Sequence, residues 1–202
     1  MGKVVAFTSL TLDGVMQAPG RPDEDPRDGF QHGGWAVPYA DPDQGRIASE
    51  GMATTGGIIL GRRTYEDFQG YWPHQTDNPF TEALNNTQKY VASTTLTEPL
   101  PWQNSTLLEG DAADAVAGLK QRLDHDLVVL GSGALVQSLR RANLVDEYVL
   151  LIHPLVLGSG SRLFPEDGTV APLRLVDTRT TSTGVLVATY QPAEPTAGGD
   201  TR

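Results

Sequence analysis

The chain has 202 residues, a length typical of one α/β domain and short for two. Its 15 basic and 25 acidic residues give a formal charge of −10, which repels nucleic acid and anionic membranes, so neither is an expected partner. The absence of cysteine excludes disulfides and thiolate chemistry. The N-terminal residues lack a signal-peptide pattern and no apolar stretch approaches a membrane span, so we expect a cytoplasmic protein.

Strand-like and helix-like patterns alternate along the chain. Apolar, β-branched runs predict strands in these segments: residues 3–10, 56–60, 89–93, 105–109, 126–133, 147–158, 173–178 and 184–190. Apolar residues at helical spacing predict helices in these segments: residues 43–54, 62–69, 111–123 and 134–142. The run at 147–158 is apolar enough for a central strand, in which Pro154 implies a bend or an end.

The chain shows no internal repeat, linker or second apolar core. Residues 1–191 are therefore expected to form one domain. Residues 192–202 are poor in apolar side chains and are expected to be a disordered tail.

A long segment at 19–42 is rich in Pro, Gly and Asp and carries three aromatic residues, Phe30, Trp35 and Tyr39. Such a segment is either a surface insertion or a loop that packs over a site. The aromatic residues favour the second interpretation, a lid or a substrate wall.

One predicted strand ends at residues suited to a phosphate group. Gly61 closes the strand, and Arg62, Arg63 and Thr64 open the next helix. Backbone N–H groups at a helix N-terminus attract anions, and paired arginines suit the 2′-phosphate of a sugar. The alternative is an arginine pair on an ordinary surface helix.

Two further strands end in the same way. Ser93 and Thr94 follow one strand, where they fit either a sugar site or an ordinary turn. Gly131, Ser132 and Gly133 lie between a buried strand and a helix, where glycines let the backbone approach a pyrophosphate. The third glycine of the usual dinucleotide fingerprint is missing, which disfavours an ordinary Rossmann domain.

The order of the motifs SLTLDG, LGRRTYEDF, VAST, LGSGALVQSL and LVDEYVLLIHPLVLGSGSRLF resembles the dihydrofolate-reductase-like superfamily. Within it, the chain is most similar to the reductase domain of bacterial riboflavin biosynthesis and its stand-alone relatives. The resemblance covers residues 3 to about 190. It implies a three-layer α/β fold, with a mostly parallel central sheet, an antiparallel C-terminal edge and helices on both faces.

The same resemblance implies an NADPH site at the strand ends. Arginines would hold the 2′-phosphate, hydroxyls would line the adenosine pocket, and glycines would hold the pyrophosphate. The residues that the resemblance assigns to the cofactor are Gly61, Arg62, Arg63, Thr64, Ser93, Thr94, Gly131, Ser132, Gly133, Ala134 and Leu135.

In the resembling families the substrate pocket lies between the first strand, the loop after it and the following helix. Here these segments supply Ser9, Trp35 and Tyr39 as pocket residues, and Asp13 and Asp41 as candidate catalytic acids. Asp13 also fits an Asx turn and Asp41 a helix cap. We expect Trp35 near the nicotinamide, although it could instead be a buried anchor. Folate reductases carry a buried acid on that helix, and the altered spacing around Asp41 argues against dihydrofolate as the substrate.

The expected function is NADPH-dependent reduction of a small nitrogen heterocycle, such as a pterin or a pyrimidine. One alternative is the riboflavin-pathway 5-amino-6-(5-phosphoribosylamino)uracil reductase, which would need basic residues for the ribose phosphate. Another is a non-catalytic protein that binds a heterocycle on the same fold. The riboflavin-type relatives suggest a homodimer. The histidines lack the spacing of metal ligands, so no metal is expected, and His153 is expected to be a packed, hydrogen-bonded side chain.

Overall fold

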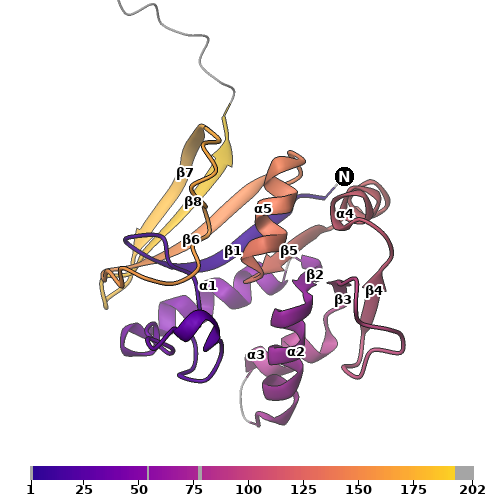
Figure 1. Cartoon of the computed structure of the whole chain (residues 1–202), viewed down its shortest axis with the longest axis horizontal. Helices are drawn as coiled ribbons and strands as arrows, with labels where there is room; N and C mark the ends of the chain where they lie inside the picture. The colour runs from indigo at the N-terminus through magenta and orange to yellow at the C-terminus, as the bar shows by residue number, and fades with distance from the viewer. Residues whose placement is uncertain (1, 54, 77–78, 194–202) are drawn as a thin grey trace, which may run out of the picture.

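The strands of the chain join one sheet. The computed structural model describes residues 2–53, 55–76 and 79–193 (Figure 1). Its strands are β1 (Val4–Thr11), β2 (Thr55–Gly61), β3 (Lys89–Ala92), β4 (Ser105–Leu108), β5 (Asp126–Leu130), β6 (Glu147–His153), β7 (Leu173–Thr180) and β8 (Leu186–Pro192). Their order across the sheet is β4-β3-β2-β5-β1-β6-β8-β7. All neighbours from β4 to β6 are parallel and β8 is antiparallel to β6 and β7, which confirms the predicted mostly parallel sheet with an antiparallel C-terminal edge.

Helices cover both faces of the sheet. They are α1 (Pro42–Ala53), α2 (Arg62–Tyr71), α3 (Pro79–Asn86), α4 (Ala112–Arg122) and α5 (Gly133–Arg141), with short 3-10 helices at Arg27–Gly29, Val37–Tyr39 and Trp72–His74. Side chains of α4 and α5 pack in one core cluster, and those of α2 and α3 pack in a second cluster with the other side of β2 and β5. In the described part of the chain, no helix is long and apolar enough to cross a membrane.

Side chains of β1 alternate between the two core clusters. Val4 and Ala6 are fully buried and belong to the cluster beneath α4 and α5. Val5 and Phe7 point to the opposite face and pack against the second cluster. A central strand of a parallel sheet is apolar on both faces for this reason. The strand therefore reads as a continuous apolar run in the sequence.

Some predicted elements differ in the structure. The helix α3 was not predicted, although Pro79 at its first position is a common signal of a helix start. The predicted tail begins too early, because Pro192 ends β8 and the backbone N–H of Ala193 donates to the carbonyl oxygen of Pro172 at 2.9 Å. Residues 194–202 lie outside the described residues.

A buried lysine joins α3 to β3. Lys89 is 0% exposed, and its Nζ donates to the carbonyl oxygens of Leu84 and Thr87, each at 2.7 Å. The same ammonium lies 4.5 Å from the centre of the Trp102 ring. Burial lowers the pKa of Lys89 to about 8, so the ammonium form still predominates at neutral pH. It satisfies carbonyl groups that the end of a helix leaves without partners.

Lys89→Met should therefore destabilise the protein far more than the loss of an ordinary lysine. The variant keeps the apolar stem but leaves buried carbonyl groups unpaired, and we expect a loss of roughly 2–4 kcal/mol in the free energy of unfolding. Lys3→Met is the control, since the Lys3 side chain is 51% exposed. Denaturant unfolding measures both. An equal loss in the two variants would contradict this role of Lys89.

Candidate functional site

The predicted cofactor segments meet at one edge of the sheet. The parallel strands β3, β2 and β5 are neighbours, so their carboxyl ends point the same way. Gly61 at the end of β2 pairs with Ala92, the residue before Ser93. Gly131 follows β5 directly, on the other side of β2. The sheet thus brings together three segments that are far apart in the sequence.

The hydroxyl of Ser132 ties two of these segments together. The backbone N–H of Gly61 donates to Ser132 Oγ at 2.8 Å, and Ser132 Oγ lies 2.9 Å from Thr64 Oγ1. Gly131 and Ser132 both have a φ of +57°, the left-handed conformation that turns the chain sharply out of β5. The start of α2 and the start of α5 are consequently held next to each other.

The backbone at both helix starts suits an anion. The residues before α2 and α5 are Gly61 and Ser132, and neither provides a side-chain hydrogen bond to the first turn of its helix. The first N–H groups of a helix have no partner within the helix, and the helix dipole favours a negative charge there. Two such starts side by side fit the two phosphates of a dinucleotide.

Some predicted cofactor residues have a structural reason of their own. A Cβ on Gly133 would lie 2.6 Å from Sδ of Met16, in the loop after β1, so this glycine makes room for a side chain of the protein. Ala134 is exposed, whereas Leu135 is buried in the core cluster beneath α5. The side chain of Leu135 packs in the core, so a ligand at this edge would meet its backbone rather than its side chain.

The remaining cofactor candidates lie on the rim of this edge. Arg62 is 3.3 Å from Glu66 one helical turn away, and Arg63 is exposed. Ser93 Oγ accepts hydrogen bonds from the backbone N–H groups of residues 95 and 96, so it also shapes a turn. Thr94 is exposed beside it.

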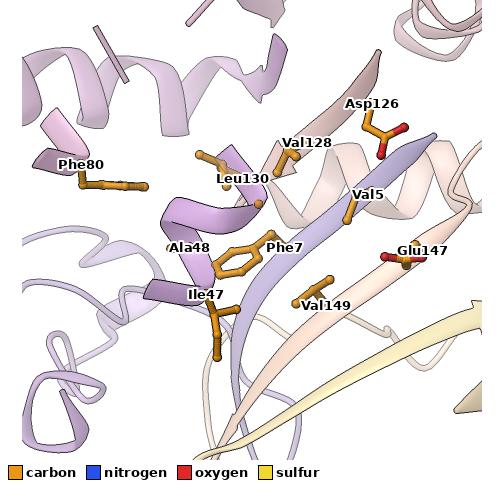
Figure 2. A pocket seen from close by; sticks show the side chains of 11 residues that line it. Val5, Phe7, Ile47, Ala48, Phe80, Asp126, Val128, Leu130, Glu147 and Val149 are labelled. Carbon is orange, nitrogen blue, oxygen red and sulfur yellow. The ribbon is translucent and has the colours of Figure 1, made fainter. Parts of the chain in front are cut away.

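An apolar pocket lies on the sheet face covered by α1 and α3. Its volume is about 140 Å³. The strands β5, β1 and β6 form its floor, and Figure 2 shows Phe80 at one end and Asp126 and Glu147 at the other. The lining residues are Val5, Phe7, Ile47, Ala48, Gly51, Phe80, Asp126, Val128, Leu130, Glu147 and Val149. The sequence does not predict these residues as a pocket, because apolar strand residues that line a pocket have the same pattern as those that fill a core.

Asp13 has a structural role rather than the predicted catalytic one. Its carboxylate accepts from Thr11 Oγ1 at 2.6 Å and from the backbone N–H groups of Leu157 and Gly158 at 3.2 and 2.8 Å. The hydrogen bond from Thr11, with those from the loop, lowers the pKa of Asp13 to about 2. A carboxylate held in this state cannot supply a proton near neutral pH. It joins the loop after β1 to the loop after β6.

Asp41 is likewise a structural residue. It accepts from the backbone N–H of Asp43 at 2.8 Å, as the predicted helix cap would, and from the hydroxyl of Ser182 at 2.5 Å. The Ser182 hydroxyl is the main cause of a lowered pKa of Asp41. The carboxylate does not line the pocket. Ser9 faces the same side of β1 as Phe7 but does not line the pocket either.

The aromatic residues of the long loop pack around His153. Trp35 is 6% exposed, its Nε1 donates to the carbonyl oxygen of Gln17 at 2.7 Å, and its ring meets the His153 ring edge-on at 5.1 Å. Tyr39 meets the same imidazole at 5.7 Å. Trp35 is therefore the buried anchor that the alternative interpretation described, and the expectation that it forms the substrate wall is corrected.

His153 itself is packed and hydrogen-bonded, as predicted. Its Nδ1 lies 3.0 Å from the carbonyl oxygen of Leu151 and 3.3 Å from that of Leu10. A carbonyl can only accept, so Nδ1 carries the proton. Nε2 is buried and has no hydrogen-bond partner among the described residues. Burial lowers the pKa of His153, which favours the neutral ring.

One family model and one curated relative match nearly the whole chain. The model of the RibD C-terminal domain matches residues 2–187. The uncharacterized protein YyaP of Bacillus subtilis (strain 168) is 32% identical over 195 residues, which are 93% of this chain and 94% of YyaP.

Solved structures share the fold. A candidate riboflavin biosynthesis protein from Shewanella sp. PV-4 superposes with a TM-score of 0.67 at 21% identity, covering 95% of this chain and 99% of its own. A pyrimidine reductase-like protein from Corynebacterium diphtheriae has a TM-score of 0.67 at 13% identity, with 96% and 93% covered. Dihydrofolate reductase from Enterococcus faecalis, complexed with NADP(H) and RAB-propyl, has a TM-score of 0.60 at 16% identity, with 95% and 96% covered.

The neutral, buried His153 should make the protein less stable in mild acid. The unfolded chain takes up this proton near pH 6.5, above the pKa of the folded state. The free energy of unfolding should therefore fall as the pH drops below about 6.5, by up to about 1.4 kcal/mol per pH unit for one proton. Denaturant unfolding between pH 7.5 and pH 5, roughly spanning that titration, measures the slope.

The variant His153→Asn should be less stable at neutral pH and should lose this part of the slope. His74→Asn is the matched control, because His74 is exposed. The role assigned to His153 is refuted if His153→Asn keeps the wild-type slope.

Proposed function

The chain belongs to the RibD C-terminal domain family, and from that premise we propose that it is an oxidoreductase that reduces a small nitrogen heterocycle with NADPH. The observation that carries the proposal is the pair of helix starts joined by Ser132, which lies next to the apolar pocket. Leu130 lines that pocket and immediately precedes Gly131. Helix starts that suit two phosphates thus adjoin a pocket that suits an apolar ring, an arrangement that hydride transfer between two bound molecules requires.

The residues of the edge fit the cofactor. The N–H groups that open α2 and α5 would hold the pyrophosphate, and Ser132 keeps the two helix starts together. Arg62 and Arg63 would bind the 2′-phosphate, which is what would favour NADPH over NADH. Ser93 and Thr94 would line the adenosine end. NADPH, when bound, supplies the hydride.

The pocket would exclude water from the substrate and orient its ring. Phe7, Val128 and Val149 offer apolar walls that exclude water from a ring placed against them. The α1 residues that line it are Ile47, Ala48 and Gly51, so α1 gives the pocket no acid among its described side chains. Folate reductases use an acid at that place, which argues against dihydrofolate as the substrate.

A second candidate is the reductase of the riboflavin pathway, which the family and the Shewanella structure favour. Its substrate carries a ribose phosphate that needs cations. Arg140 instead pairs with Asp167 at 2.7 Å, and Arg162 Nε donates to the Asp13 carbonyl oxygen at 2.9 Å. Neither lines the pocket, so we favour a heterocycle without a phosphate. A homodimer, usual among the riboflavin-type relatives, remains a prediction.

The arginine pair provides the direct test of the cofactor. Changing both Arg62 and Arg63 to Ala should weaken NADPH binding about ten- to hundredfold, since charge-assisted contacts to the 2′-phosphate are lost, and should leave NADH binding nearly unchanged. Calorimetric titration of both cofactors measures this. Arg122→Ala, at the exposed end of α4, is the control for a lost positive charge.

Equal affinity of the wild type for NADPH and NADH would count decisively against the assignment of Arg62 and Arg63. An enzyme is then distinguished from a binding protein by adding a panel of heterocycles and measuring whether the absorbance of NADPH falls as it is oxidised. A chain that binds NADPH and a heterocycle but never oxidises the cofactor is the non-catalytic alternative.

A further inference from the structure

The two ends of the apolar pocket differ in chemistry. At one end Leu130 adjoins the cofactor edge through Gly131. At the other end Asp126 and Glu147 are the first residues of β5 and β6. Strand residues advance by about 3.3 Å each, so Asp126 and Leu130 are separated by roughly 13 Å along β5. A ligand lying in the pocket therefore has a reacting end at Leu130 and a remote end at the carboxylates.

Between these ends the walls are apolar and partly aromatic. Phe80 lies at the end opposite the carboxylates, and Phe7, Val128 and Val149 line the floor (Figure 2). In the described part of the chain, no lysine or arginine lines the pocket. Flat walls without hydrogen-bonding side chains select a flat, apolar body and leave polar recognition to the ends.

The remote end has an excess of negative charge. Asp126 Oδ1 accepts the backbone N–H of Lys3 at 2.7 Å, and Glu147 Oε2 accepts from Lys3 Nζ at 3.1 Å and from Gln191 Nε2 at 3.0 Å. The Lys3 ammonium thus pairs with Glu147, while Asp126 accepts from the backbone N–H of Lys3. The Glu147 side chain is 17% exposed while that of Lys3 is 51% exposed, so the carboxylate lies deeper than its cation. Each carboxylate has about four lone-pair sites, so both keep capacity to accept from a ligand.

Resting on the proposed function, we propose that the substrate is a flat, largely apolar ring compound with an amine or another cationic group at its remote end. That group binds Asp126 and Glu147, and the ring lies between Phe7 and α1 with its opposite end at the cofactor edge. A substrate with a phosphate or carboxylate at the remote end is repelled by the same two carboxylates. Charge complementarity at this end sets the specificity of the reductase.

Three probes that share one ring and differ in charge test this directly. They are naphthylmethylamine, naphthylmethanol and naphthoate, titrated into the full chain by calorimetry with and without NADPH. The amine should bind about tenfold more tightly than the alcohol, since it gains a charge-assisted hydrogen bond, and naphthoate should bind most weakly. This comparison uses the wild type and needs no variant.

Variants then locate the effect. Asp126→Asn and Glu147→Gln should each weaken the amine about tenfold and leave the alcohol unchanged. Glu109→Gln is the control, because it removes one negative charge from an exposed site outside the pocket. Gly51→Leu should abolish binding of all three probes, because Gly51 lines the pocket and a larger side chain there would fill it. The fold should tolerate this change, since a Cβ on Gly51 meets no neighbouring atom within 4 Å.

An amine no tighter than the alcohol overturns the proposal, and so does naphthoate as the tightest probe, which would mean that Lys3 recruits an anion. The titration of NADPH alone keeps the two proposals apart. If NADPH binds and the amine preference is absent, only the substrate class is wrong. If NADPH does not bind, the proposed function fails whatever the probes show.

Discussion

The parallel alignment of β3, β2 and β5 is the constraint on which the candidate site depends. Parallel strands present all their carboxyl ends at one edge, where the chain must leave the sheet. The hydrogen bonds of Ser132 to Gly61 and Thr64 fix how it leaves, because they hold the starts of α2 and α5 against each other. Ser132 adopts the left-handed backbone conformation, which is strained for a residue other than glycine, and these hydrogen bonds offset the strain.

The same sheet separates two tasks. Its carboxyl edge offers N–H groups and arginines, which suit phosphates, and the face beneath α1 offers an apolar pocket. Because the net charge is −10, an anionic cofactor can bind such a chain only where local groups oppose the overall field. Two contacts hold the loop after β1 in place. The Trp35 ring packs on His153, and the Asp13 carboxylate accepts from the loop after β6.

The sequence predicted the edge better than the pocket. Glycines, hydroxyls and arginines at strand ends are local signals, so the sequence alone marks Gly61, Ser132 and Arg62 as cofactor candidates. Phe7 and Ala6 are both apolar, and only the packing shows that Phe7 lines a pocket while Ala6 fills the core. Asp13 is a catalytic candidate only through the family resemblance, and the sequence does not show that its carboxylate accepts from Gly158, which is far away along the chain. Helix α3 was not predicted because it has only 8 residues, too few for a clear helical repeat of apolar side chains.

The central claim is that the edge formed by β3, β2 and β5 binds NADPH. Backbone amide NMR of the full chain during titration with NADPH tests it most directly. The account predicts that the largest shifts cluster at residues 61–64, 93–94 and 131–134, with smaller ones at Phe7 and Leu130. Shifts confined to other segments, or no saturable shifts, would contradict it.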